Sequence, residues 1–209
     1  MDTQRKRVPQ IVLPRGLGGR ITFVLMNRMH GDIYRIVAPV LALKPDDYLL
    51  EVACGNGYFL KKHASHVRRV AGLDHSPLAI ETAIRNNKNR VEAGTAEFVE
   101  GDAARLPWAD ATFSAVVAMG SFVAFTKPLE SIKEMYRVLR PGGRAVITLE
   151  FNAEDGRNHS REVQKWGMSL LSEADMRTMM QAAGFSEISV DYAKAGGMPN
   201  IMVLLGIKP

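Results

Sequence analysis

The chain has 209 residues, of which 46% are hydrophobic, enough for one domain around one substantial core. Its single cysteine, Cys54, excludes an intramolecular disulfide and a cysteine-rich metal site, and it suits a reducing, cytoplasmic location. No apolar run approaches the ~18 residues needed to cross a bilayer. The N-terminus lacks the apolar region of a signal peptide, so neither a transmembrane segment nor a secretory leader is expected.

The charge of the chain is concentrated at its N-terminus. The net charge of +5 lies wholly in residues 1–30, and residues 31–209 carry equal numbers of acidic and basic side chains. Proline and glycine residues in the same stretch predict a flexible basic arm over residues 1–19. Such an arm could meet nucleic-acid phosphates, an anionic membrane surface or an acidic substrate, or remain a solvated tail. No pattern of an RNA-binding module accompanies it, so a nucleic-acid partner is not favoured.

After the arm, residues 20–43 are predicted to be helical. Apolar residues recur there at helical spacing, and Pro39 is expected to start a second helix or to kink the first. His30 and Tyr34 are four residues apart, so they share one face of this helix. They are candidates for polar groups near a substrate, although such residues are more often found at the edge of a core.

Residues 48–58 are the most informative stretch of the chain. A short apolar strand leads into the sequence EVACGNG at residues 51–57, and a helix is predicted from Tyr58 to about Ser65. Glycines at such a turn allow a ligand to approach the main chain, while the following helix directs its free N–H groups at that ligand. A dinucleotide fingerprint would need a third glycine where this chain has Leu60, and there is no P-loop sequence.

Three further strands are predicted, each followed by polar or small residues. The strand 69–74 ends in Asp74, the strand 96–103 ends in Gly101-Asp102-Ala103, and the strand 113–119 is followed by Gly120-Ser121-Phe122. A carboxylate at the end of the second strand of an α/β unit is well placed to accept the hydroxyls of a ribose. Asp74 could instead cap the helix that follows Ser76 and Pro77.

Residues 134–143 read E-x-x-R-V-L-R-P-G-G, with Pro141 stopping a helix and the glycines turning the chain into a fifth strand. These motifs, in this order over residues 48–150, resemble class I S-adenosylmethionine-dependent methyltransferases of the ubiquinone/menaquinone (type 11) group. The resemblance implies a single α/β Rossmann-like domain over residues 20–209. Its seven-stranded, mostly parallel sheet has helices on both faces, and strands near 187–192 and 201–207 complete it. The helical segment 20–43 would cover the mouth of the site.

The resemblance also implies the cofactor, S-adenosyl-L-methionine, with S-adenosyl-L-homocysteine as its product. Glu51 would organise the glycine turn or contact the amino group of the cofactor, and Asp102 would bind the adenine amine. Ala53 stands where the family more often has glycine. The cofactor-binding residues implied in this way are Glu51, Ala53, Gly55, Gly57, Asp74, His75, Asp102, Ala103 and Met119.

Methyl transfer from a sulfonium is an in-line displacement, so it needs mainly proximity, orientation and desolvation. Relatives often carry a histidine after the fourth strand, but residues 119–125 of this chain have no titratable side chain. The candidates for catalytic groups are therefore His30, Tyr34 and His159. His159 lies with Trp166 in the polar segment 152–166, which is predicted to rim the acceptor pocket.

The favoured acceptor is a small molecule that is aromatic, quinone-like or lipid-like. An RNA or protein methyltransferase that uses the basic arm, and a non-catalytic scaffold that binds the cofactor, remain as alternatives. The arm also allows peripheral membrane contact, the chain could be a monomer or a homodimer, and no metal is expected. Beyond the pocket, a helix is predicted to begin after Ser172 as its N-cap and to end at Gly184.

Overall fold

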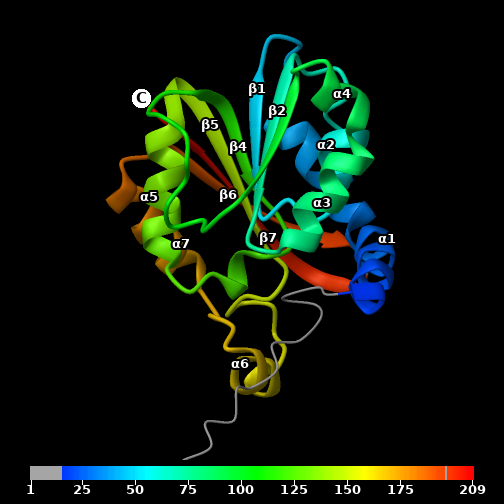
Figure 1. The fold of residues 1–209 in the computed structure, drawn as a ribbon. Helices are drawn as coiled ribbons and strands as arrows, with labels where there is room; N and C mark the ends of the chain where they lie inside the picture. The colour runs from blue at the N-terminus through cyan, green and yellow to red at the C-terminus, as the bar shows by residue number, and fades with distance from the viewer. Residues whose placement is uncertain (1–15, 196) are drawn as a thin grey trace, which may run out of the picture.

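The structure is a computed structural model that describes residues 16–195 and 197–209, without the side chains of residues 16, 17, 19–29 and 166. It is built on a seven-stranded sheet of order β3-β2-β1-β4-β5-β7-β6 (Figure 1). β7 is antiparallel to both of its neighbours, and the pairs among β1–β5 are parallel, which confirms the predicted α/β fold. The strands are β1 (Tyr48–Val52), β2 (Arg69–Asp74), β3 (Ala96–Glu100), β4 (Phe113–Ala118), β5 (Leu139–Leu149), β6 (Ser186–Ala195) and β7 (Met198–Ile207).

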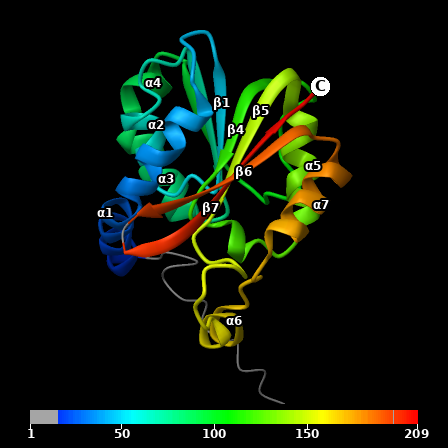
Figure 2. The ribbon, with the colours of Figure 1, turned by 180° about the vertical axis from the view of Figure 1, so that it is seen from behind.

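Helices cover both faces of the sheet (Figures 1 and 2). α1 to α4 lie on one side, α5 and α7 lie on the other, and α6 projects away from the body beyond the carboxyl ends of the parallel strands. The helices are α1 (Gly16–Leu41), α2 (Tyr58–Lys62), α3 (Pro77–Asn86), α4 (Lys88–Glu92), the 3-10 turn η1 (Phe122–Ala124), α5 (Pro128–Val138), α6 (Ser160–Trp166) and α7 (Glu173–Ala183).

Two apolar cores lie on the two faces of this sheet. Successive residues of a strand point to opposite faces. Leu49 of β1 accordingly belongs to the core beneath α1 and α2, whereas Leu50 belongs to the core beneath α5 and α7. Both side chains are fully buried. The central strands are therefore mostly apolar, and most polar side chains that line the cavity come from the carboxyl ends of the strands, from the loops that follow them and from α1.

α1 is one helix rather than two. Pro39 lies inside its last turn, and the amide of Ala42 closes the end of the helix on the carbonyl of Pro39 at 3.1 Å. The expectation that Pro39 starts a second helix is therefore wrong, because the chain turns toward β1 only three residues later. The helix also begins at Gly16, inside the predicted arm of residues 1–19, and residues 1–15 of that arm lie outside the described residues.

The predicted N-cap of α7 is confirmed, whereas α3 is capped by Ser76 and not by Asp74, the acid considered for that role. Ser76 accepts a hydrogen bond from the amide of Ala79 and Pro77 occupies the first turn of α3. Ser172 forms a capping box with Asp175 at the start of α7, and Gly184 ends that helix with a φ of 107°. α2 ends at Lys62, three residues before the predicted end at Ser65.

The signature at residues 134–143 forms a helix end and a bulged strand start. α5 ends at Val138, which is consistent with the nearby Pro141, and β5 begins immediately at Leu139. Along β4, Phe113 pairs with Leu139 but Ala115 already pairs with Arg144. The glycines therefore lie in a bulge at the start of β5 rather than in a separate turn, and Gly142 has a φ of 72°.

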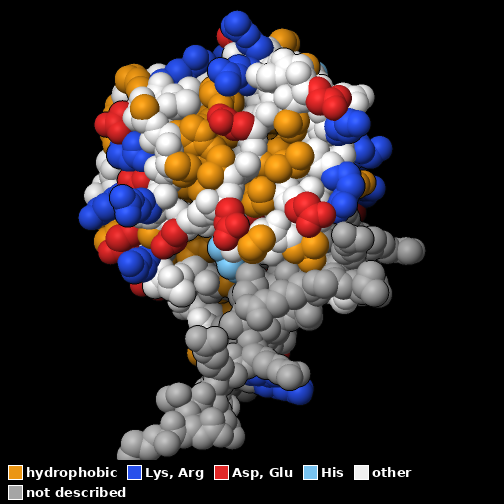
Figure 3. All heavy atoms as spheres, in the orientation of Figure 1, with side chains coloured by type: hydrophobic (Ala, Val, Ile, Leu, Met, Phe, Trp, Pro, Cys, Tyr) orange, Lys and Arg blue, Asp and Glu red, His pale blue; other side chains and the backbone are white. Residues whose placement is uncertain are grey.

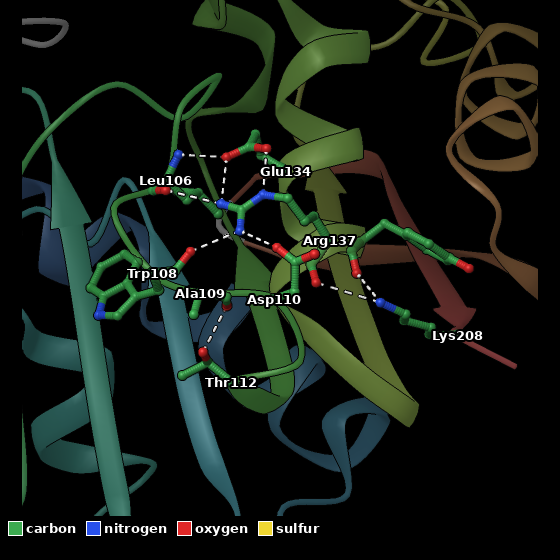
Figure 4. A network of polar contacts seen from close by, with 9 residues as sticks. Leu106, Trp108, Ala109, Asp110, Thr112, Glu134, Arg137 and Lys208 are labelled. Carbon is green, nitrogen blue, oxygen red and sulfur yellow. Dashed lines mark hydrogen bonds and ion pairs between the residues drawn. The ribbon is translucent and has the colours of Figure 1, made fainter.

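Arg137 of the same signature holds the segment between β3 and β4 against α5 (Figure 4). Its guanidinium donates to Glu134 at 2.7 and 2.8 Å, to Asp110 at 2.8 Å, and to the carbonyls of Trp108 and Leu106 at 2.8 and 3.0 Å. The planar donor fork of arginine suits this bidentate arrangement. The network fixes the segment that follows Asp102.

The surface seen in Figure 3 carries interspersed acidic and basic side chains. This matches the zero net charge of residues 31–209. No helix in residues 16–195 and 197–209 is both long and apolar enough to span a bilayer.

Candidate functional site

A cavity of about 850 Å³ lies at the carboxyl ends of β1 to β4, beneath the C-terminal half of α1. β1 and β4 are neighbours in the sheet although they are not consecutive in sequence, so this is the point at which the strand order reverses. Ligands of open α/β sheets bind at such a point. The cavity has two sides, which we call the polar half, formed after β1, β2 and β3, and the apolar half, formed by η1, the start of α5 and the segments flanking α6.

The glycine turn after β1 forms the floor of the polar half. Ala53, Gly55 and Gly57 have φ angles of 59°, 52° and 67°. A Cβ on Gly57 would lie 2.8 Å from Nδ2 of Asn87, whereas a Cβ on Gly55 would meet no atom within 4 Å. Gly57 is therefore required by packing against α3, while Gly55 leaves open space toward the cavity that a ligand can use.

Asp74 ties the two strand ends of the polar half together. One carboxylate oxygen, Oδ2, accepts from the amide of Gly55 and the other accepts from the amide of Ser76, both at 2.9 Å. The residue is 7% exposed and lines the cavity. Because each carboxylate oxygen can accept a second hydrogen bond, Asp74 retains acceptor capacity for a ligand. His75 lies beside it with an exposed imidazole on the cavity rim.

Glu51 is a buried carboxyl that lacks a partner. It is 4% exposed, and its Oε2 makes no hydrogen bond among the described residues. Burial, followed by the charge of Asp74, holds its pKa well above the usual value. A buried polar atom without a partner at a cavity wall fits a ligand donor such as an ammonium group. Burial also raises the pKa of the Cys54 thiol, which argues against a thiolate nucleophile.

Asp102 and Ala103 complete the polar half, and they line the cavity together with Met119, another of the predicted cofactor residues. Asp102 is exposed after β3, and its Oδ1 accepts from the amide of Ala104 at 2.9 Å. Met119 follows β4 and is 6% exposed. The fold thus brings eight of the nine predicted cofactor residues to the cavity wall, while Gly57 lies behind it in the packing against α3.

His30 and Tyr34 of α1 also line this cavity. Their rings meet edge to face with centroids 6.3 Å apart. The ring of His30 lies against Gly120, where an added Cβ would be 2.6 Å from Cε1. Burial lowers the pKa of His30, so its imidazole is neutral near pH 7 and can accept a proton. Burial, then the charges of Glu51 and Glu150, raise the pKa of Tyr34, so its hydroxyl stays protonated.

His159 is not among the residues that line the cavity. Its imidazole is buried, lies 2.6 Å from a carboxylate oxygen of Asp155, and packs edge to face on Phe151, which does line the cavity. The buried pairing with Asp155 holds the ring behind Phe151, so His159 is not part of the cavity wall, and its proposed role toward the acceptor stays a prediction. Trp166 ends α6, and its side chain lies outside the described residues.

Glu150 is the functional candidate that the sequence reasoning missed. It follows β5 directly and is 5% exposed. Its Oε1 accepts from the amide of Gly120 at 3.0 Å and from the Thr148 hydroxyl at 2.6 Å, while Oε2 has no partner among the described residues. Burial raises its pKa to about 7. The sequence pattern that could have identified Glu150 is an acidic residue at the end of an apolar strand, as at Glu51 and Asp74.

The apolar half contains further side chains that the sequence did not single out. Met168 and Phe151 come from the two sides of the α6 segment and meet η1. The amide of Ser169 donates to the carbonyl of Val123 at 2.8 Å, which fixes that segment to the cavity wall. Within the described ranges, no group of three or more His, Cys, Asp and Glu side chains could hold a metal.

Comparison with known families supports this geometry. Residues 50–147 match a family model described as a methyltransferase domain. This segment of the chain is therefore similar to methyltransferase domains. The match spans β1 to β5, the strands whose ends form most of the cavity wall.

Two curated relatives are similar to about half of this chain. The chain is 38% identical over 114 residues to the chloroplastic 2-phytyl-1,4-beta-naphthoquinone methyltransferase of Arabidopsis thaliana, covering 52% of this chain and 43% of the relative. It is 41% identical over 106 residues to the demethylmenaquinone methyltransferase of Deinococcus radiodurans, covering 49% of this chain and 42% of the relative. The chain therefore spans less than half the length of these relatives.

A solved structure is similar over nearly the whole fold. It is a chain of the complex between the Haloferax volcanii Trm112 methyltransferase activator and its methyltransferase, with a TM-score of 0.73 and 21% identity. The similarity covers 88% of this chain and 92% of that chain. At this level of identity the similarity concerns the fold.

Proposed function

We propose that this protein transfers the methyl group of S-adenosylmethionine to a small-molecule acceptor. The observation that carries the proposal is the joining of two unlike surfaces in one cavity. The polar half offers a carboxylate, an orphaned buried carboxyl and a glycine turn, whereas the apolar half is closed by Val123, Phe125 and Phe151. A cavity of about 850 Å³ is within the ordinary range for ligand sites.

The polar half fits the three chemical groups of the cofactor. Asp74 would accept the ribose hydroxyls, because it closes the second strand beside the glycine turn. The orphaned oxygen of Glu51 would accept from the ammonium of the methionine part. Asp102, exposed on the rim after β3, would accept from the adenine amine. S-adenosylhomocysteine would remain in the same place after transfer.

The apolar half together with α1 would hold the acceptor. Transfer is an in-line displacement, so orientation and exclusion of water supply much of the acceleration. An acceptor with an O–H bond must lose a proton as the new bond forms, and the neutral imidazole of His30 is placed to take it. The protonated hydroxyl of Tyr34 would donate to the acceptor. The quinone-type acceptors in the names of the two relatives support a reduced, ring-shaped acceptor.

A second proposal, methylation of RNA or protein, is favoured by the basic side chains of residues 1–30. It would require the N-terminal arm to contact the acceptor, and binding would then fall steeply with salt. The single buried cysteine supports a cytoplasmic location, which we include in the proposal.

The test is transfer of labelled methyl groups from S-adenosylmethionine to a panel of reduced naphthoquinones, catechols, total RNA and protein extract. We expect labelled small-molecule product that His30→Gln reduces by about 10²–10⁴-fold without loss of cofactor binding. Label in RNA or protein alone, lost on deletion of residues 1–15, would favour the second proposal. If none of the compounds in the panel became labelled, the assignment of a naphthoquinone or catechol acceptor would be contradicted.

A further inference from the structure

Glu150 occupies a position that cofactor binding alone does not explain. β4 lies between β1 and β5 in the sheet, so Gly120 at the end of β4 lies between the two halves of the cavity. Glu150 sits behind this residue and accepts from its amide at 3.0 Å. A buried carboxyl is thus attached to the point at which the two halves meet.

Among the described residues, no cationic side chain is paired with the carboxyl of Glu150. From α1, His30 and Tyr34 approach it across the cavity wall, and Glu51 lies near the same tyrosine on the side of β1. Its own strand contributes the hydroxyl of Thr148. In the part of the chain that the structure describes, no Lys or Arg forms an ion pair with either glutamate. A buried carboxyl in such surroundings changes its protonation state when a positive charge arrives.

The cofactor and its product differ by one charge at this junction. The sulfonium of S-adenosylmethionine is positive at every pH, while the thioether of S-adenosylhomocysteine is neutral. With the cofactor in the polar half and the acceptor in the apolar half, the methyl group would pass between them, so the charge that appears on binding and disappears on transfer would lie near the junction. The amino-acid end, in contrast, is the same in both molecules, so Glu51, which would accept from its ammonium group, should respond equally to both.

We propose that Glu150 is a charge-sensing positioning residue: it releases its proton to solvent when the sulfonium binds, and it takes up a proton again once the methyl group has left. The ionised carboxylate would then favour the charged substrate over the neutral product. This inference rests on the proposed cofactor site. In this role Glu150 forms no covalent bond with the cofactor or the acceptor, and it exchanges only a proton with water.

The experiment is calorimetric titration of the full chain at pH 7 in two buffers of different ionisation enthalpy, which gives the number of protons released. S-adenosylmethionine and S-adenosylhomocysteine are compared. Because burial raises the pKa of Glu150 to about 7, part of the free protein holds this proton at pH 7, so the sulfonium compound should release more protons than the thioether, by at most about one. Protons from Glu51 should appear equally with both ligands.

Two variants separate the glutamates. Glu150→Gln keeps an oxygen acceptor for the Gly120 amide and should abolish the difference between the ligands, while Glu51→Gln should leave the difference in place. Thr148→Val preserves the carboxyl but removes a hydrogen bond that favours its ionised form. It should increase the difference at pH 7 and extend it to higher pH, and it serves as the test if Glu150→Gln does not fold.

Equal proton release by the two ligands in the wild type would overturn the role of Glu150 alone. The role of Glu150 would also be overturned if the difference in proton release between the two ligands remained in Glu150→Gln. The same conclusion would follow if Thr148→Val did not shift the pH range of that difference. Failure of S-adenosylmethionine to bind at all would overturn the cofactor assignment and this inference with it.

Discussion

In the polar half of the cavity, the functional groups are held by short hydrogen bonds to neighbouring main-chain amides. Asp74, for example, bonds the amides of Gly55 and Ser76. In the apolar half, apolar side chains from η1 and from both sides of α6 are positioned mainly by packing, together with the main-chain bond from Ser169 to Val123. The first half is therefore built before any ligand arrives, whereas the shape of the second depends on contacts between distant segments. Changes in the two halves should have separable effects.

The largest expected effect is in the glycine turn, where packing and ligand access can be separated. Gly57→Ala should lower the free energy of unfolding by about 2–4 kcal/mol, since it combines left-handed strain with an overpacked contact 2.8 Å from Asn87. Gly55→Ala should cost only about 1 kcal/mol of strain, because its Cβ meets open space. It should nevertheless weaken binding of S-adenosylmethionine. Urea unfolding and calorimetry measure the two effects, and equal destabilisation by both variants would contradict the difference in packing.

Glu150→Gln should change the pH dependence of stability by up to ~3 kcal/mol. The folded-state pKa of Glu150, about 7, lies above its ordinary 4.5. Between these values the folded chain holds a proton that the unfolded chain has lost, so the stability contributed by this group is fully present below pH 4.5 and is lost as pH rises through 7. Urea unfolding from pH 5 to 8 should show a decline that the variant reduces. An unaltered slope would show that Glu150 ionises normally in the folded protein.

Asp74→Ala should weaken S-adenosylmethionine binding by ~1–3 kcal/mol, since the ribose hydroxyls and the two amides would lose their acceptor. Phe125→Ala is the matched change in the apolar half, and it should leave cofactor affinity nearly unchanged while weakening the acceptor. Calorimetric titration with S-adenosylmethionine in the absence of acceptor measures the cofactor affinity of each variant and so separates the two effects. Cofactor affinity that responds equally to both variants would mean that the two halves are not independent.

The smallest expected effect is an increase in stability at Ala53. Ala53 has a φ of 59°, a left-handed conformation that glycine adopts without strain. Ala53→Gly should raise the free energy of unfolding by about 1 kcal/mol and preserve cofactor binding. Ala42→Gly is the control outside the cavity, because Ala42 has a φ of 44° and is exposed. Destabilisation of both variants in thermal unfolding would show that left-handed strain is not relieved at these positions.

The sequence predicted which residues of the polar half line the cavity because their determinants are local, while their roles toward the cofactor stay predictions. A strand, a glycine turn and an acid at the next strand end lie within about one βαβ unit, so Glu51, Gly55 and Asp74 could be assigned before the fold was known. His159 was predicted in the cavity because only its loop could be placed. Its pairing with Asp155 depends on how that loop folds back, which the sequence pattern does not determine.

The apolar half and the helix over it were less predictable for the same reason. Pro39 allows a helix end, a kink or a new helix, and the position of β1 decides among them. α6 lies within a segment predicted only as a polar connection. Glu150 carries the signal of an acid after an apolar strand, but its significance comes from Gly120 on a neighbouring strand.

The most direct test of the central claim is calorimetric titration of the purified chain with S-adenosylmethionine and, separately, with NAD. The geometry of Glu51, Gly55 and Asp74 predicts micromolar binding of S-adenosylmethionine that Asp74→Ala weakens, and no binding of NAD. Binding of NAD, or the absence of S-adenosylmethionine binding by a folded protein, would contradict the assignment of this cavity.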